Sequence, residues 1–211
     1  GRFVGRVSKT LATLENGTIA SRSHAWDLAR VLEVSELVEH FASPERRRVV
    51  EAVLERFRSG VLPLAGELGR GVIHGDINEL NLLVHPTEPK VTGLLDFGDI
   101  LVSWQVNELA ISMAYGMLKK EEPVEAAGHI AAGYAQEKPL SPAEWSALPT
   151  LVACRLAQSI TIGNYSAIQD PANSEYLLTT QEPGWTALER LFRVPEQAVR
   201  SRWQEMAAGG T

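Results

Sequence analysis

Cysteine is almost absent from this sequence, and so are long hydrophobic segments. Cys154 is the only cysteine among 211 residues, which excludes an intrachain disulfide and a cysteine-rich metal cluster and favours a reducing compartment such as the cytosol. No run approaches the roughly 18 apolar residues of a transmembrane helix. The N-terminal residues also lack the apolar core of a signal peptide. We therefore expect a soluble, cytoplasmic protein with no membrane partner.

Basic charge is also scarce. Lysine and arginine number 20 against 26 aspartates and glutamates, and the formal net charge is -6 at pH 7. The one basic cluster, Arg46 to Arg48, is spread around the circumference of a predicted helix and forms no stripe, so we interpret it as solvated surface. This distribution excludes a general nucleic-acid partner. An acidic protein that handles a polyanion needs metal ions to offset its own charge.

Hydrophobic residues make up 45% of the sequence and charged residues 22%, which is ordinary for a globular protein with a sizeable core. No repeat, low-complexity tract or linker divides the chain, so we expect one domain over residues 1–211. The expected fold class is α+β and mostly helical, with a small central β-hairpin. Helices are expected over 3–14, 26–41, 44–60, 106–118, 123–136, 141–165, 184–193 and 195–207, and strands at 72–73, 82–84 and 91–95.

Two dense polar clusters lie on either side of the predicted hairpin. The first, His74 to Asn81, has the spacing H-x-D-x-x-x-x-N of a kinase-type catalytic loop. The second, Asp96-Phe97-Gly98-Asp99, contains the string D-F-G. Each cluster taken alone is equally typical of a turn or a helix cap. Because both occur in the right order across a strand, a turn and a second strand, we favour a phosphoryl-transfer centre.

The chemistry explains these residue types. Transfer from a nucleoside triphosphate requires an acceptor hydroxyl aimed at the γ-phosphorus and a divalent metal that neutralises the transferring oxygens. Asp76 is the candidate that orients the hydroxyl and accepts its proton. Asn81 and Asp96 offer the hard oxygen ligands that Mg²⁺ prefers.

Three further polar residues need an explanation. We interpret His74 as a structural hydrogen-bonding group that fixes the loop. Glu108 lies inside the apolar run 106–118, so it is either on a solvated stripe or buried with donors; we favour backbone N–H groups of the catalytic loop as those donors. Arg155, in another apolar helix, would pair with an acid such as Glu108 or hold a substrate carboxylate, and the sequence leaves both open.

The strings H-G-D-I-N-E-L-N and G-L-L-D-F-G-D resemble those of the aminoglycoside phosphotransferase and choline kinase family, small-molecule kinases with a protein-kinase-like fold. Within that family the likeness to hydroxylysine kinases extends to V-S-K-T-L, E-L-A-I-S-M-A-Y and L-V-A-C-R-L-A-Q-S, and so covers almost the whole chain. The resemblance implies transfer of the γ-phosphate of ATP or GTP to the hydroxyl of a small amino alcohol similar to hydroxylysine, with Mg²⁺ as cofactor.

The resemblance also implies a role for each matching residue. Asp76 would be the catalytic aspartate, and Asn81 and Asp96 the magnesium ligands. His74 and Gly75 would shape the loop, and Glu108 would brace it. Asp99 and Trp104 follow the metal aspartate, and we expect them to face the ammonium group of the acceptor.

One departure from the family pattern is large. Such kinases have an N-terminal lobe of strands with a loop over the phosphates and a lysine on the third strand. Before His74 the only lysine is Lys9, which lies in a helical pattern, and no G-x-G-x-x-G occurs there. We therefore expect this chain to be the C-terminal lobe, with the covering lobe, and in some relatives further fused domains, as its partners. The chain alone is expected to show no appreciable kinase activity.

Alternative functions stay open at this point. The lobe could serve as a kinase-like binding or regulatory domain without catalysis, or the same oxygens could belong to a metal-dependent hydrolase. The acceptor could also be choline, homoserine or an aminoglycoside. The complete set of Asp76, Asn81 and Asp96 favours the kinase.

Overall fold

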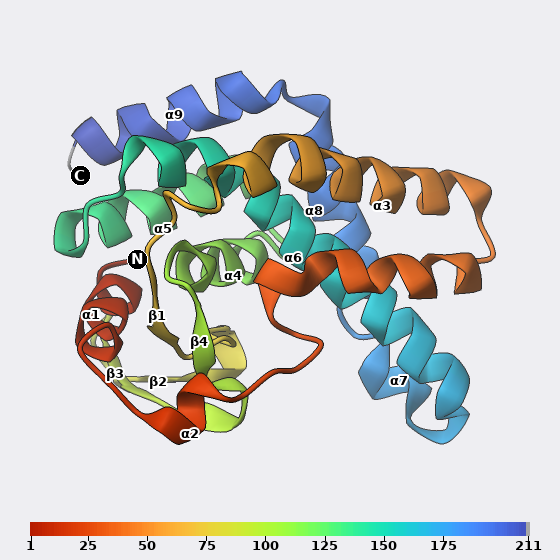
Figure 1. The fold of residues 1–211 in the computed structure, drawn as a ribbon, viewed down its shortest axis with the longest axis horizontal. Coiled ribbons are helices and arrows are strands. Elements are labelled where there is room, and N and C mark those ends of the chain that lie inside the picture. The colour runs from red at the N-terminus through yellow and green to blue at the C-terminus, as the bar shows by residue number, and fades with distance from the viewer. Residues whose placement is uncertain (210–211) are drawn as a thin grey trace.

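The strands and the first two helices gather at one end of the molecule, and longer helices build the rest (Figure 1). The structure, a computed structural model, describes residues 1–209. Its α-helices are α1 (Arg2–Leu11), α2 (Gly17–Ala20), α3 (Pro44–Arg56), α4 (Val106–Gly116), α5 (Pro123–Glu137), α6 (Pro142–Gln169), α7 (Ser174–Leu177), α8 (Gln181–Arg193) and α9 (Glu196–Gly209). Its strands are β1 (Arg70–Ile73), β2 (Leu82–Val84), β3 (Val91–Leu94) and β4 (Leu101–Trp104). Tighter or wider turns of helix fill several connections: η1 (Leu28–His40), η2 (Phe57–Val61), η3 (Leu62–Leu64), η4 (Glu79–Asn81), η5 (Phe97–Asp99) and η6 (Pro171–Asn173).

The β part consists of two antiparallel pairs. Strands β2 and β3 form the expected hairpin, with Leu82 opposite Leu94 and a bulge between Leu83 and Val84. Strand β1 pairs with β4, so that Ile73 lies opposite Leu101. The sequence predicted no strand between Asp99 and the helix expected from residue 106, and this is wrong for β4, because four residues are too few to establish an alternating pattern. The pairing brings the two polar clusters together at the ends of β1 and β4.

Helix α6 is the central element of the helical part. Its N-terminus carries a capping box, in which the Ser141 hydroxyl accepts from the Glu144 N–H and the Glu144 carboxylate accepts from the Ser141 N–H. The helix packs against α4, η1 and α8, so most of its middle is buried among apolar side chains. Cys154 lies there, fully buried, and desolvation raises the pKa of its thiol. A polar side chain on this helix therefore needs partners of its own.

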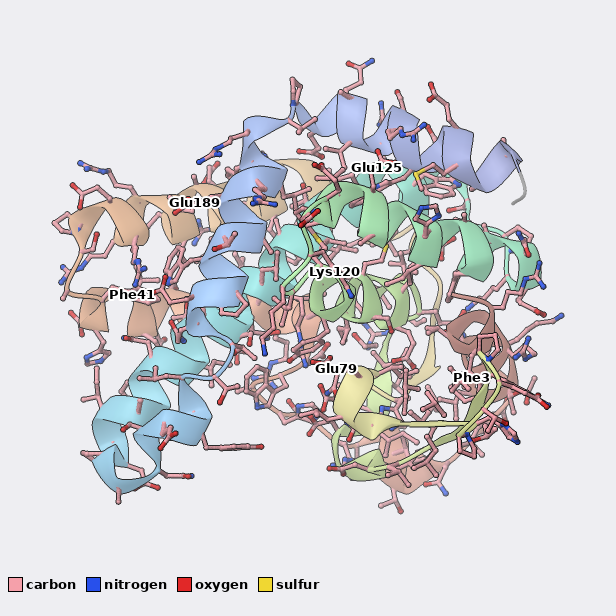
Figure 2. All side chains as sticks on the ribbon, turned by 180° about the vertical axis from the view of Figure 1, so that it is seen from behind. Phe3, Phe41, Glu79, Lys120, Glu125 and Glu189 are labelled. Atoms are coloured by element: carbon pink, nitrogen blue, oxygen red, sulfur yellow. The ribbon has the colours of Figure 1, made fainter. Side chains whose placement is uncertain are left out.

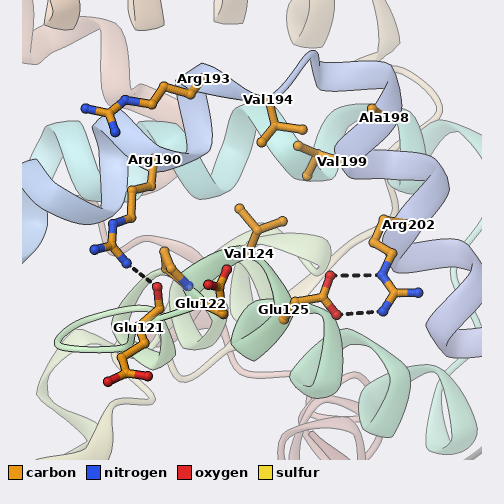
Figure 3. A pocket seen from close by; sticks show the side chains of 11 residues that line it. Glu121, Glu122, Val124, Glu125, Arg190, Arg193, Val194, Ala198, Val199 and Arg202 are labelled. Atoms are coloured by element: carbon orange, nitrogen blue, oxygen red, sulfur yellow. Dashed lines mark hydrogen bonds and ion pairs between the residues drawn. The ribbon is translucent and has the colours of Figure 1, made fainter.

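Helix α5 lies between α1, α4 and α9. Where its start meets α8 and α9, a hollow of about 550 Å³ opens at the surface (Figure 3). Arg202 donates two hydrogen bonds to the Glu125 carboxylate at 2.9 and 2.7 Å across it, and Arg190 donates to the Glu121 carbonyl. These contacts fasten the C-terminal helices to α5.

Within residues 1–209, none of the helices combines the length and the apolar character that a membrane crossing requires.

Candidate active site

The loop after β1 turns on a glycine. Gly75 has φ +84°, a conformation that side chains rarely adopt, and a Cβ placed there would lie 2.7 Å from the Asp99 carbonyl oxygen. The turn therefore presses the loop against the D-F-G-D segment. On the other side of that segment, Arg22 donates to the Gly98 carbonyl, and His24 Nε2 lies 3.1 Å from the Asp99 carbonyl. Both clusters of the sequence are thus held in one place.

Glu108, in the first turn of α4, receives the backbone of this loop. Its two carboxylate oxygens accept the N–H groups of His74 at 2.6 Å and Gly75 at 3.2 Å. These are the donors that the sequence favoured for a buried acid here. Burial raises the pKa of Glu108 to about 7, although the two hydrogen bonds oppose that rise. The carboxylate can stay buried because two N–H groups replace part of its lost hydration.

His74 is fully buried behind the loop. Its Nδ1 accepts the Asp76 N–H at 3.3 Å, and its Nε2 lies 2.9 Å from the Leu95 carbonyl oxygen. This pair of contacts requires a neutral ring with the hydrogen on Nε2. Burial lowers the pKa of His74, which also favours the neutral form. The ring of Phe97 packs edge-on against it at 4.8 Å, so the histidine ties the loop to the D-F-G segment.

The Asp76 carboxylate lies at the mouth of the loop and is held from both sides. Its Oδ2 accepts the side-chain amides of Asn78 and Asn81, each at 3.0 Å. Its Oδ1 accepts from Arg155 Nη2 at 3.1 Å. Asn78 also caps η4, since its Oδ1 accepts the Asn81 N–H. The carboxylate is therefore fixed in orientation while its side chain stays partly exposed.

Asp96 is positioned by the hairpin. The Leu95 N–H donates to the Asn81 carbonyl at 2.8 Å, which places Asp96 directly beside the end of the loop that follows β1. Asp96 itself has φ +56°, a left-handed conformation that aspartate tolerates better than most residues, and its Oδ1 accepts the Gly98 N–H. Such conformations cost about 1–3 kcal/mol and cluster at functional sites.

The donor set fits Mg²⁺. The amide nitrogen of Asn81 is used by Asp76, which leaves its side-chain oxygen as the free donor, and Asp96 adds an exposed carboxylate. Both are hard oxygen ligands. Over residues 1–209 no group of three or more His, Cys, Asp or Glu side chains could hold a metal. Two protein ligands suit Mg²⁺, which usually keeps water and substrate phosphate in its remaining positions.

A cleft of about 490 Å³ opens beside Asp76, between the loop and helices α4, α6 and α7. Figure 2 shows the turn that carries Glu79 below helix α4, at one edge of this region. Three acids and two bases supply the charge of its lining: Asp76, Glu79, Asp99, Lys119 and Arg155. Aromatic and aliphatic side chains, including Trp26 and Tyr115, form the remaining walls. The cleft suits a small molecule that carries charges of both signs.

Arg155 is the most buried charged residue of the cleft, with 1% exposure. It pairs with the acid Asp76, and no hydrogen bond or ion pair joins it to Glu108, the acid that the sequence suggested as a partner. Its guanidinium lies 4.9 Å from the ring centre of Trp26 and 5.3 Å from that of Tyr115. Residues 79 positions apart in the chain thus meet at the cleft.

Trp104 lies elsewhere, and the expectation that its ring faces an acceptor is wrong. The side chain is 5% exposed and packs in the hydrophobic core, with its ring 6.0 Å from that of Phe57. It ends β4, and its neighbour Ser103 is also buried, so this strand end turns into the core. Asp99, in contrast, does line the cleft.

Three residues of the site were not singled out in the sequence: Asn78, Trp26 and Tyr115. Asn78 lies inside the H-x-D-x-x-x-x-N string, where its capping position before Glu79 could have identified it. Trp26 and Tyr115 look like ordinary core aromatics in sequence, and only the packing of η1 and α4 around α6 places them beside Arg155.

A catalytic-type loop and a D-F-G segment joined across a hairpin, on a mostly helical body, define the class of kinase-like phosphotransferase folds. The model of the phosphotransferase enzyme family matches residues 1–145, and the chain belongs to this family.

Individual relatives agree with this assignment. The chain is 31% identical over 217 residues to a hydroxylysine kinase of Bos taurus, covering 98% of this chain and 58% of the relative. It is 32% identical over 214 residues to a hydroxylysine kinase of Danio rerio, covering 97% and 60%. The chain therefore spans little more than half the length of the curated relatives it matches.

A solved structure shows the same fold. The amicoumacin kinase hAmiN, in complex with AMP-PNP, Ca²⁺ and Ami, superposes with a TM-score of 0.54 at 16% identity, covering 95% of this chain and 57% of that one. The expected fold class, mostly helical α+β with a kinase-like arrangement, is confirmed.

Proposed function

We propose that this chain is the C-terminal lobe of a small-molecule kinase, which transfers the γ-phosphoryl group of ATP or GTP to the hydroxyl of a small amino alcohol. The observation that carries the proposal is the position of Asp76, which is held by Asn78, Asn81 and Arg155 at the edge of the cleft. The hydroxylysine kinase relatives support an acceptor similar to hydroxylysine.

The proposed mechanism assigns one task to each residue. Asp76 accepts the proton of the acceptor hydroxyl while the hydroxyl oxygen bonds to the γ-phosphorus and the bond from that phosphorus to the β-phosphate oxygen breaks. The products are a phosphorylated acceptor and a nucleoside diphosphate. Asn81 and Asp96 would hold Mg²⁺, which when bound neutralises charge on the phosphate oxygens. Glu108 keeps the loop in shape through the His74 and Gly75 N–H groups.

The nucleotide and a second lobe would cover the hairpin side of the site. Large apolar side chains are exposed there, among them Leu80 at 77% and Val84 at 65%, together with Leu83, Leu95 and Phe97. Where such side chains adjoin, exposed apolar surface is typical of a binding face. This supports the proposal that the chain works with a further part of the intact protein, as its share of the relatives' length also indicates.

The alternatives have less support. A metal-dependent hydrolase of the two-metal type would want more His or acidic ligands than the described residues bring together. A kinase-like domain with a purely binding role has no need for the ordered contacts of Asp76 or for the left-handed Asp96.

The substitution Asp76→Asn in the intact protein tests the proposal. Asparagine cannot accept the hydroxyl proton, so the rate of phosphate transfer is expected to fall by about 10²–10⁴-fold. Asp170→Asn, the same change at the exposed end of α6, is the control and should leave the rate unchanged. Radiolabelled transfer from γ-labelled ATP and GTP measures both. A wild-type rate in Asp76→Asn would refute the assigned proton acceptor.

A further inference from the structure

We infer that Arg155 recognises the carboxylate of the proposed hydroxylysine-like acceptor, and that this carboxylate takes the place of Asp76 as the partner of the guanidinium. The inference rests on the proposed function and assigns a specificity-determining residue to it. In the empty site Arg155 pairs with Asp76. When the acceptor binds, Arg155 pairs with the carboxylate of the acceptor in place of Asp76.

The contacts of Arg155 are the first support. Its Nη1 donates to the Trp26 carbonyl and the Gln158 side chain, and its Nη2 to Asp76 and the Tyr115 hydroxyl. Its Nε is buried and has no hydrogen-bond partner. An unused N–H group in a buried cation is costly, so it marks a position where a ligand oxygen would be stabilised.

The arrangement of these donors suits a carboxylate. The Nε–H of an arginine and one N–H of Nη2 lie on the same edge of the planar guanidinium, and together they bind a carboxylate with two parallel hydrogen bonds. Asp76 and Tyr115 engage this edge only at Nη2. The rings of Trp26 and Tyr115, which contact the guanidinium, restrict its movement. The guanidinium of Arg155 is therefore held rigidly, and its Nε–H is free to donate to a ligand.

The charges of the cleft place the other groups of such an acceptor. Glu79 and Asp99 line the cleft and suit its ammonium groups, whereas Lys119 and Arg155 are the two cations of the lining. A molecule with a hydroxyl, an ammonium and a carboxylate matches this mixture better than an amino alcohol without a carboxylate.

The exchange also has a chemical reason. Both oxygens of Asp76 accept hydrogen bonds in the structure, Oδ2 from two amides and Oδ1 from Arg155. When the acceptor carboxylate occupies Arg155, Oδ1 is released for the acceptor hydroxyl. Asp76 becomes neutral when it takes up the hydroxyl proton, and the bound carboxylate then remains as the anionic partner of the buried guanidinium.

The experiment compares two pairs of acceptors with the intact protein, Mg²⁺ and ATP or GTP. One pair is hydroxylysine and the diamino alcohol that remains when its carboxyl group is removed. The other pair is homoserine and 3-amino-1-propanol, which is homoserine without its carboxyl group. For the better pair, we expect removal of the carboxylate to lower kcat/KM by about a hundredfold, the loss of two charged hydrogen bonds. This comparison needs no variant, so it does not depend on the folding of one.

Two variants show whether Arg155 binds the carboxylate of the acceptor or only holds Asp76 in position. Arg155→Gln should lower kcat/KM for both acceptors, because Arg155 also holds Asp76, and the loss should be about a hundredfold greater for the carboxylate acceptor. Gln181→Leu is the matched control, because Gln181 also ties another helix to α6, through the Ile160 carbonyl, but neither contacts Arg155 nor lines the cleft. Its effect should be equal on both acceptors.

The outcomes distinguish the two proposals. If no acceptor is phosphorylated, the proposed function fails, and the inference fails with it. If transfer occurs but Arg155→Gln lowers kcat/KM for both acceptors by the same factor, Arg155 only supports Asp76. The inference alone is then overturned. Equal wild-type kcat/KM values with and without the carboxylate would overturn it as well.

Discussion

At the scale of single residues, the site depends on a few side chains that are fixed by other residues of the loop. Gly75 permits the turn, His74 joins the loop to the D-F-G segment, and Asn78 orients Asp76. Gly75 and His74 hold the loop in place without lining the cleft, whereas Asn78 lines it. Small changes at these positions should therefore act on stability and on the position of Asp76 together.

Gly75→Ala tests this dependence. A methyl group at φ +84° and 2.7 Å from the Asp99 carbonyl oxygen is expected to lower the free energy of unfolding by about 1–3 kcal/mol and to reduce phosphate transfer. Urea denaturation measures the first effect. Gly66→Ala is the control, because nothing lies within 4 Å of a Cβ there, and it should change stability by less than about 0.5 kcal/mol. Equal stabilities for the two variants would contradict the account of the loop.

The residue scale also marks the limit of what the sequence predicts. Motif spacing alone singled out Asp76, Asn81 and Asp96, because their separation along the chain is short. The pairing of Arg155 with Asp76 and the burial of Trp104 could not be predicted, because both depend on how distant elements pack. The catalytic and metal-binding roles of the motif residues stay predictions.

At the scale of elements, the start of α4 and the ends of β1 and β3 carry the site. Glu108 lies in the first turn of α4 and holds the loop that follows β1, while Leu95, after β3, holds Asn81. Acids near a helix N-terminus are favoured by the helix dipole. The position of α4 against β4 and α6 thus sets the position of the loop that carries Asp76.

Glu108→Gln tests this link through pH. Because the pKa of Glu108 is about 7 in the folded chain and about 4.5 in the unfolded one, the folded state binds the proton more tightly. Protonation of the Glu108 carboxyl group therefore stabilises the fold. This contribution to the free energy of unfolding is complete below pH 4.5 and is lost as pH rises through 7, a change of about 3 kcal/mol. Glutamine does not titrate, so the variant should lose this part of the pH dependence.

Urea denaturation of both proteins between pH 4.5 and 8 gives the comparison. The wild-type free energy of unfolding should fall relative to that of Glu108→Gln as pH rises. Parallel curves would show that Glu108 does not titrate in this range.

Most elements could be predicted from the sequence, because their helices are long and amphipathic or begin with a clear cap such as Ser141. Exceptions are short. Strand β4 was missed, and so was the short helix α2, which begins after Asn16, whose side chain accepts the N–H groups of Thr18 and Ile19. Segments of four residues carry too little periodicity, and tertiary pairing decides them.

At the scale of the whole molecule, the helices form most of the body, and the four strands gather at one end of it (Figure 1). The cleft opens beside Asp76. The apolar residues around the hairpin remain exposed next to Asn81 and Asp96. These features fit a lobe that works together with a covering part of the intact protein.

Residues 1–211 on their own should therefore transfer no appreciable phosphate. A covering lobe positions the triphosphate and excludes water, and such positioning can contribute roughly 7–11 kcal/mol to lowering the barrier. The measurement is transfer by the purified chain with Mg²⁺, nucleotide and hydroxylysine, alongside the intact protein. Steady turnover by the chain alone would contradict this expectation.

The most direct test of the central claim is phosphate transfer by the intact protein, with Mg²⁺ and ATP or GTP, to hydroxylysine, choline, homoserine, ethanolamine and kanamycin. We predict transfer to a hydroxyl of at least one acceptor, with hydroxylysine preferred. Nucleotide binding without transfer to any acceptor would contradict the assignment as a small-molecule kinase and favour a binding role for the fold.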